Sequence, residues 1–164
     1  MIKDYFSSGK KFNIKIDYIE EKKPLGTAGS LCYLKNLENQ TIIVTNCDVI
    51  SDIDYGDALN YHTENSADAT MVVRRYETRN PFGVIETDGN KFISYQEKPV
   101  KYENINAGIY IFETNTFKHL EDEEFQDMPD FFTKLLKLGK KVKVYPIFEY
   151  WQDLGQKDNN IDIK

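Results

Sequence analysis

Apolar and polar positions follow two different periods along the first half of the chain. Strand patterns occur at 13–19, 41–45 and 69–73, and helical patterns occur between them at 28–34 and 54–64. Thr27 is expected to cap the first of these helices. Strands that alternate with helices predict an α/β fold with parallel strands in this half.

The second half has shorter strand patterns that lie closer together. They cover 83–86, 92–96, 107–112 and 142–146, with helical patterns at 114–121 and 129–138. The close spacing of strands from 83 to 112 predicts an antiparallel or mixed insert. At the two ends, Ile2–Ser8 has the pattern of a last helical stretch stopped by Gly9, and another helix is expected to start within Gln156–Lys164.

Composition narrows the class of protein. The 164 residues suffice for one domain with a hydrophobic core, and the net charge of −6 argues against a nucleic-acid backbone as partner. Two isolated cysteines and two isolated histidines do not form a zinc pattern. No apolar run has the length of a membrane span and no signal peptide opens the chain, so a reduced, cytoplasmic setting without a membrane partner is expected.

Asp48 follows the strand pattern at 41–45, where ligands of an open α/β sheet gather. A carboxylate there suits Mg²⁺, which usually binds one or two protein carboxylates together with phosphate oxygens. The alternative is that Asp48 is an ordinary loop acid or prepares the cap of the next helix.

Three further segments carry possible ligand groups, namely Lys22–Gly29, Gln96–Pro99 and Tyr150–Gly155. The first could present backbone N–H groups to a nucleotide or be a plain turn before a helix. In the second, Lys98 suits phosphate and Glu97 suits sugar hydroxyls, although a solvated ion pair fits equally. In the third, Asp153 could end a turn or be a second metal ligand.

Taken in order, the motifs resemble those of the sugar-1-phosphate nucleotidyltransferases. The matching segments are "KKPLGTAGSL", "TIIVTNCD", "PFGVIE", "QEKP", "NAGIYIF" and "YWQDLG", and the likeness runs from Ile2 to about Lys157. The amino-acid sequences of these motifs resemble most the mannose-1-phosphate guanylyltransferase-like branch of the family. The resemblance implies a Rossmann-like mixed sheet of the nucleotide-diphospho-sugar transferase type.

The resemblance also implies roles for single residues. Asp48 and Asp153 would be the Mg²⁺ ligands and, with Lys98, the catalytic residues. The nucleotide would bind at Leu25, Gly26 and Thr27, and the sugar at Gly83, Glu97 and Asn106. The implied reaction joins a nucleoside monophosphate from an NTP, with GTP favoured, to a sugar 1-phosphate and releases pyrophosphate.

Two departures from the family pattern concern Cys47 and the start of the chain. The family usually has glycine or another small residue where Cys47 stands, and its opening strand and glycine-rich, triphosphate-binding loop have no counterpart here. Residues 1–164 are therefore expected to be the C-terminal two-thirds of the domain, without its first two strands and inactive alone. Those strands would lie between 13–19 and 41–46, so exposed strand edges are expected to pair with another copy.

Two other functions are compatible with the same residues. A non-catalytic binding or regulatory module would share the fold but would not need both metal acids. A glycosyltransferase-type nucleotide-sugar binder would use a DxD triplet, for which Asp52-Ile53-Asp54 is the formal candidate.

Overall fold

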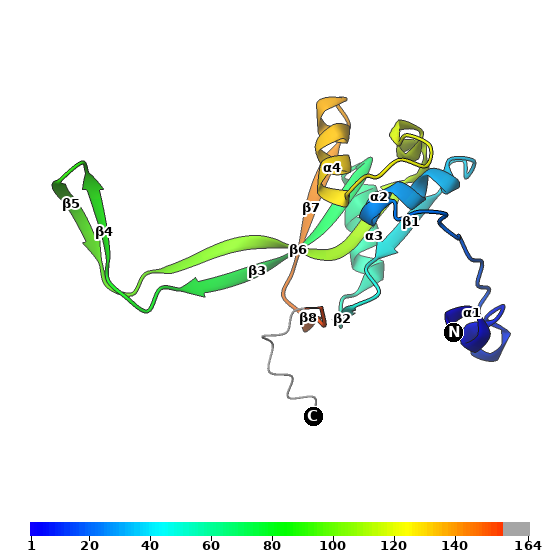
Figure 1. The fold of residues 1–164 in the computed structure, drawn as a ribbon, viewed down its shortest axis with the longest axis horizontal. Helices are drawn as coiled ribbons and strands as arrows, with labels where there is room; N and C mark the ends of the chain where they lie inside the picture. Colours follow the sequence, from blue (N-terminus) through cyan, green and yellow to red (C-terminus); the bar gives the residue numbers. More distant parts are fainter. Residues whose placement is uncertain (156–164) are drawn as a thin grey trace. The chain divides into compact units, whose positions relative to one another are not determined.

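The computed structural model describes residues 1–155. Its largest sheet among these residues is mixed and has four strands. Its order is β1 (Thr41–Thr45), β6 (Val100–Glu113), β3 (Ala69–Arg79) and β7 (Val142–Ile147). β6 runs antiparallel to β1 and β3, whereas β7 runs parallel to β3 (Figure 1). The predicted α/β class is confirmed, and the parallel strands β1 and β3 are separated by β6.

The residues divide into two units, which we describe separately. The second unit holds the sheet and consists of Thr41–Glu113 and the chain from Lys140 onward; the first consists of Met1–Gln40 and Thr114–Gly139. The predicted helix within Gln156–Lys164 lies outside the described residues. Within residues 1–155, no helix has the length and apolar character needed to cross a bilayer.

The helix α3 (Tyr55–Glu64) packs its apolar side on the core of the second unit. Asp54 caps it, because its carboxylate accepts the backbone N–H groups of Gly56 and Asp57. Residues from α3, β3, β6 and β7, together with Ile53 just before α3, form the core: Ile53, Ala58, Val72, Ala107, Ile109, Ile111 and Ile147. The alternation of β6 thus directs one set of its side chains toward this core.

A buried histidine joins α3 to the sheet. His62 is only 1% exposed, and its Nδ1 lies 2.8 Å from the Thr70 hydroxyl on β3. Its Nε2 lies 3.3 Å from a carboxylate oxygen of Glu113 at the end of β6. Burial lowers the pKa of His62, while the nearby carboxylates of Glu113 and Asp68 act in the opposite direction.

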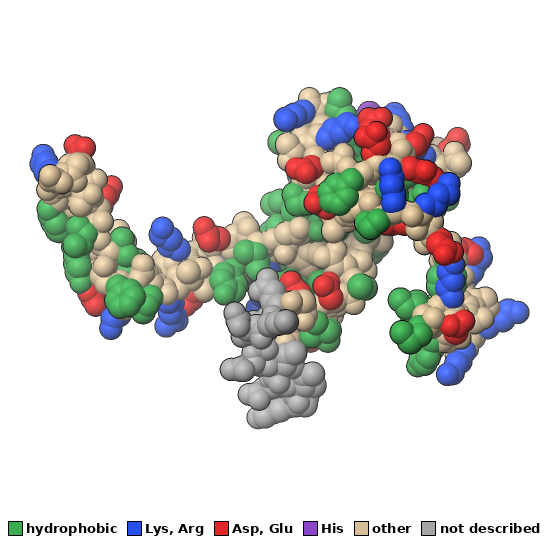
Figure 2. Space-filling model, viewed as in Figure 1, with side chains coloured by type: hydrophobic (Ala, Val, Ile, Leu, Met, Phe, Trp, Pro, Cys, Tyr) green, Lys and Arg blue, Asp and Glu red, His purple; other side chains and the backbone are tan. Residues whose placement is uncertain are grey.

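β3 and β6 continue beyond the sheet as a two-stranded ribbon that leads to a hairpin (Figure 1). The hairpin consists of β4 (Val84–Asp88) and β5 (Lys91–Gln96). The predicted antiparallel insert is confirmed. Figure 2 shows hydrophobic side chains along this part, and Phe82, Ile85 and Phe92 are among the exposed ones.

A third, short ladder follows β1. β2 (Val49–Ser51) pairs antiparallel with β8 (Trp151–Asp153). This pairing places the segment that follows β1 beside the last strand of the described chain. The two acids predicted to bind metal lie at this ladder.

The first unit is helical. Its elements are α1 (Ile2–Phe6), η1 (Lys10–Phe12), α2 (Gly26–Gly29), η2 (Ser30–Leu34), η3 (Thr114–His119) and α4 (Met128–Lys137). In α4 the buried residues Met128, Phe131, Phe132 and Leu135 recur with helical spacing, which confirms the helix predicted at 129–138.

The predicted strand at 13–19 is wrong. Residues 14–20 have no regular secondary structure, and Ile14, Tyr18 and Ile19 are exposed. Alternation alone does not make a strand, because its backbone N–H and C=O groups need a neighbouring strand to pair with. No described strand pairs with this segment.

Candidate active site

One carboxylate oxygen of Asp48 and one of Asp153 lie near the same point, the Cβ position of Gly155. The β2–β8 ladder pairs Val49 with Asp153, and the Leu154 N–H donates to the backbone carbonyl of Asp48 at 2.8 Å. A Cβ atom placed on Gly155 would stand 3.1 Å from Asp48 Oδ2 and 3.1 Å from Asp153 Oδ1. The absent side chain of Gly155 therefore leaves a space that both carboxylates face.

This acid pair fits a hard cation. Gly155 donates its N–H to Asp153 Oδ1 at 2.8 Å, which orients that carboxylate. Mg²⁺ typically takes one or two carboxylates and completes its octahedron with water and phosphate oxygens. Within residues 1–155 no group of three or more His, Cys, Asp or Glu side chains forms a candidate metal site, so a cation held here would depend on this pair and on oxygens from its substrate.

A β-bulge brings the "NAG" segment next to the acid pair. In the β3–β6 register Met71 is opposite Tyr110 and Val73 is opposite Asn106, so Val72 faces three residues of β6. Gly108 has a φ of +70°, and a Cβ there would stand 2.9 Å from Asn46 Nδ2. The Asn46 N–H also donates to the Gly108 carbonyl at 2.8 Å, which fixes the segment that carries Asp48.

The side chains of Asn106 and Trp151 stabilise the bulge by hydrogen bonds. Asn106 accepts the Gly108 N–H at 2.9 Å and donates to the Tyr110 hydroxyl at 2.8 Å. Trp151 donates its indole N–H to the Ala107 carbonyl at 2.8 Å. The structure therefore brings together the "NCD", "NAG" and "WQDLG" motifs, although the Asn106 amide is already engaged within the bulge.

Gly83, Glu97 and Lys98 form a second group at the base of the β4–β5 hairpin. The Tyr95 hydroxyl donates to Glu97, and the Tyr95 ring lies against Gly83. Lys98 is exposed and has a φ of +43°, which is uncommon for a residue with a side chain and disfavoured before a proline. Such backbone strain is concentrated at functional sites.

The two groups are separated along the ribbon. Asn106 lies beside the acid pair, whereas β6 begins six positions earlier at Val100, just after Lys98. Six residues of extended strand span about 20 Å. The predicted sugar-binding residues are thus divided, with Asn106 near the acids and Gly83 and Glu97 at the hairpin.

The predicted nucleotide segment lies in the first unit and packs tightly on Glu124–Asp127. Leu25 is buried, and Gly26 has a φ of +77° with the Gln126 carbonyl 2.6 Å from its Cβ position. The N–H groups of Ala28 and Gly29 donate to that carbonyl at 2.9 and 3.1 Å. These two donors are thus bonded within the protein, which agrees with the alternative that the segment is a turn before a helix.

Thr27 does not cap its own helix, which begins at Gly26 after Leu25. Its N–H donates to Asp127 Oδ1 at 3.2 Å, and its hydroxyl accepts the N–H of Met128 at 2.8 Å. Thr27 therefore caps the start of α4 instead. At the start of α2, the backbone N–H groups donate to the Asp127 carboxylate and the Gln126 carbonyl.

Sequence reasoning missed Tyr95, Asp127 and the space left by Gly155. Tyr95 stands two residues before Glu97, the spacing that puts two strand side chains on one face, and this signal was available. Asp127, 100 residues from Thr27, has no local signal.

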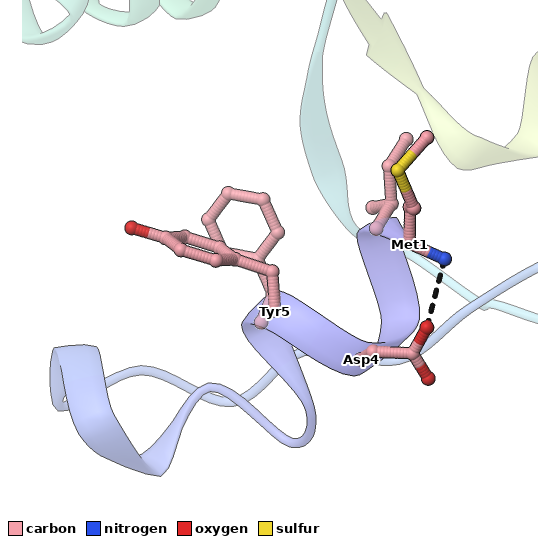
Figure 3. A pocket seen from close by; sticks show the side chains of 5 residues that line it. Met1, Asp4 and Tyr5 are labelled. Atoms are coloured by element: carbon pink, nitrogen blue, oxygen red, sulfur yellow. Dashed lines mark ion pairs between the residues drawn. The ribbon is translucent and has the colours of Figure 1, made fainter.

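A further hollow lies on α1 and does not resemble a catalytic site. Figure 3 shows its lining, formed by Met1, Ile2, Asp4, Tyr5 and Phe6. The ion pair in it joins the terminal ammonium of Met1 to Asp4 at 2.8 Å. All five residues belong to one short helical segment, so no polar groups converge from separate elements.

Comparison with known proteins identifies the family. The model of the nucleotidyl transferase family matches residues 1–164. The chain belongs to the nucleotidyl transferase family. The fold is shared with a solved structure: the chain matches HddC from Yersinia pseudotuberculosis, in a structure complexed with GMP-PN, with a TM-score of 0.66 and 23% identity over 95% of this chain and 68% of that one.

Curated relatives of this nucleotidyl transferase family chain include mannose-1-phosphate guanylyltransferases. That of Mycobacterium tuberculosis is 33% identical over 156 residues, covering 92% of this chain and 44% of the relative. The mannose-1-phosphate guanyltransferase of Pichia angusta is 32% identical over 155 residues, covering 90% and 42%. The chain thus spans less than half the length of these relatives.

Proposed function

We propose that this member of the nucleotidyl transferase family serves nucleotidyl transfer from an NTP, with GTP favoured, to a sugar 1-phosphate. The products are an NDP-sugar and pyrophosphate. The observation that carries the proposal is the convergence of Asp48 and Asp153 on the space beside Gly155. The guanylyltransferase names of the relatives support guanine and mannose as the first substrates to test.

The residues have distinct roles in the proposed reaction. Asp48 and Asp153 would hold Mg²⁺, which would supply neutralisation of charge on the α-phosphate. Lys98 binds the sugar phosphate, and Glu97, Gly83 and Asn106 contact the sugar. Leu25, Gly26 and Thr27 line the nucleotide base, with Gly26 and Thr27 held in place by Gln126 and Asp127.

The chemistry needs positioning rather than a general base. A phosphate oxygen of the sugar 1-phosphate attacks the α-phosphorus, and the bond from that phosphorus to the bridging β-phosphate oxygen breaks. The electron pair leaves with pyrophosphate. Because the attacking oxygen is already ionised at neutral pH, the side chains contribute charge neutralisation and alignment.

The chain is proposed to be a partial domain over residues 1–164, located in the cytoplasm and without turnover by itself. The family's glycine-rich triphosphate loop has no counterpart in these residues. β1 has one strand partner, β6, among the described strands, and we propose that its other edge pairs with a second copy. Size-exclusion chromatography with light scattering checks this, since Val44→Lys should reduce the association.

Mn²⁺ binding, followed by electron paramagnetic resonance with and without GTP, tests the metal site. Asp48→Asn and Asp153→Asn should each weaken Mn²⁺ binding by tenfold or more, roughly the loss expected for a metal-site residue. Asp52→Asn is the matched control, because Asp52 is an acid four residues after Asp48 that has no atom within 4 Å of the Gly155 Cβ position. Equal Mn²⁺ affinity in all four proteins would overturn the assignment, and a loss only in Asp52→Asn would favour the DxD alternative.

Pyrophosphate release tests the reaction itself. Each of the four NTPs is incubated with mannose 1-phosphate or glucose 1-phosphate, Mg²⁺ and the full chain. Absence of turnover together with Asp48-dependent GTP binding is the expected result. Turnover would show that the chain is sufficient without the triphosphate loop.

A binding module is the second candidate, and the distance between Lys98 and the acid pair along the ribbon favours it. In that case GTP or the sugar phosphate would bind with unchanged affinity after Asp48→Asn and Asp153→Asn. The enzyme proposal requires the GTP–Mg²⁺ affinity to fall in both variants.

A further inference from the structure

Two motif segments of the hairpin region meet at a side chain that neither motif contains. Gly83 precedes β4, and Tyr95 lies near the end of β5. A Cβ on Gly83 would stand 2.5 Å from Cε2 and 2.6 Å from Cζ of Tyr95, closer than real Cβ contacts. The absence of a side chain at position 83 therefore makes room for the Tyr95 ring.

The same tyrosine reaches the next motif. Glu97 comes directly after β5, which ends at Gln96, and lies two positions beyond Tyr95. The Tyr95 hydroxyl donates a hydrogen bond to Oε2 of Glu97. Tyr95 is thus in contact with both Gly83 and Glu97, which come from separate segments of the chain.

We propose that Tyr95 is a positioning residue that holds Glu97 for recognition of the sugar. The hydroxyl engages Oε2, which leaves Oε1 to accept a hydrogen bond from a sugar hydroxyl. This inference rests on the proposed function, because it takes Glu97 as a sugar-binding group. It adds a residue, Tyr95, whose hydroxyl would act on the substrate only through Glu97.

The physical reason is preorganisation. Glu97 is exposed on a hairpin, and a free glutamate side chain there would sample many rotamers. A hydrogen bond to a charged group is stronger than a neutral one, and it fixes the carboxylate before the ligand arrives. Phenylalanine at position 95 would fill the same space beside Gly83 without holding the carboxylate.

Electrostatics agree with this geometry. The hydrogen bond to Glu97 raises the pKa of Tyr95, and partial desolvation adds to the effect. The phenol, like that of an ordinary tyrosine, is protonated at neutral pH and can act as donor. Loss of the Glu97 carboxylate should therefore return the Tyr95 pKa toward its ordinary value.

The first arm of the experiment needs no ligand. The ¹³Cζ signal of Tyr95 is followed by NMR against pH in the full chain and in Glu97→Ala. The signal should titrate at a higher pH in the unmodified chain. Identical titrations, with the Tyr76 signal as an internal reference, would overturn the proposed contact.

The second arm measures binding of α-mannose 1-phosphate by NMR shift titration. Tyr95→Phe should weaken the affinity about tenfold, the effect of one charge-assisted hydrogen bond. Tyr76→Phe is the matched control, because Tyr76 lies on β3, outside the β4–β5 hairpin, and is 52% exposed against 53% for Tyr95. Gly83→Ala should also weaken binding, since its methyl group would push the Tyr95 ring away from Glu97.

The two arms separate the possible outcomes. Equal affinity of Tyr95→Phe and the unmodified chain would overturn the positioning role while leaving the proposed function standing. Failure of the unmodified chain to bind α-mannose 1-phosphate, and glucose 1-phosphate titrated in the same way, would overturn the sugar-binding role of Glu97, and hence the proposal. In that case the titration would still decide whether Tyr95 holds Glu97.

Discussion

Thr27 and Asp127 cap each other's helices. The Asp127 carboxylate accepts the backbone N–H of Thr27 at the start of α2, and the Thr27 hydroxyl accepts the N–H of Met128 at the start of α4. Two helix starts far apart in the sequence therefore depend on one pair of side chains. These two hydrogen bonds fix the position of the predicted nucleotide segment.

Removing either partner should loosen that segment. Thr27→Ala or Asp127→Ala is expected to cost about 1 kcal/mol, as for other lost helix caps. Hydrogen exchange of the Ala28 and Gly29 amides measures the effect locally. Thr27→Ser, which keeps the hydroxyl, is the control, and the double variant should cost less than the sum of the two single ones because the sites are coupled.

Substitution of Gly155 tests the shared space between the acids. Gly155→Ala places a methyl group 3.1 Å from both carboxylates and should weaken Mn²⁺ binding roughly tenfold by displacing them. Leu154→Ala, a change at an exposed neighbour, should leave the affinity unaltered. Unchanged Mn²⁺ affinity in Gly155→Ala would mean that the cation lies elsewhere.

Trp151 provides an optical signal for the acid pair. It is the single tryptophan of the chain, it is followed two residues later by Asp153, and its indole N–H is bound to the Ala107 carbonyl. Binding of Mn²⁺ is expected to quench its fluorescence, and Asp153→Asn should abolish the quenching. The Trp151→Phe variant, which lacks the N–H donor, should bind Mn²⁺ more weakly because β8 loses its link to the bulge.

His62 should make stability depend on pH. Its pKa in the folded protein lies below the ordinary value of 6.5, chiefly because burial disfavours the charged form. The unfolded chain therefore takes up the proton first as pH falls, so the stabilisation is complete above about pH 6.5 and is lost as pH falls toward and through the folded-state pKa. Urea unfolding at a series of pH values measures this.

The His62→Gln variant is the comparison for that measurement. Glutamine retains polar groups near Thr70 and Glu113 but does not titrate. Its stability should change less between pH 7 and pH 5 than that of the unmodified chain. Equal pH dependence in both proteins would show that His62 is not the group responsible.

The sequence predicted those elements whose pattern is local. The strand at 41–45 and the helices at 54–64 and 129–138 appear as expected, because apolar periodicity acts over a few positions. The strand at 13–19 failed, since pairing requires a neighbour that the alternation of Ile14 and Ile16 cannot specify.

The candidate site was predictable only as a set of segments. The motifs named Asp48, Asp153 and Asn106, but not that Gly155 leaves the space between the two acids or that the Asn106 amide closes a bulge. Nor could they show that Lys98 follows β5 at the far end of the ribbon. These features depend on strand register and on contacts between distant residues, which a linear pattern does not encode.

The bulge at Ala107–Ile109, where three residues of β6 lie opposite one residue of β3, restricts where insertions and deletions can occur in this protein. Deleting one residue there would exchange the two faces of the rest of β6, so that Ile109 and Ile111 would leave the core they share with Val72. The β4–β5 turn has no such constraint, because residues added at its tip shift no register within the sheet. Insertions and deletions among relatives should therefore be found at Asp88–Lys91 and be absent from the bulge.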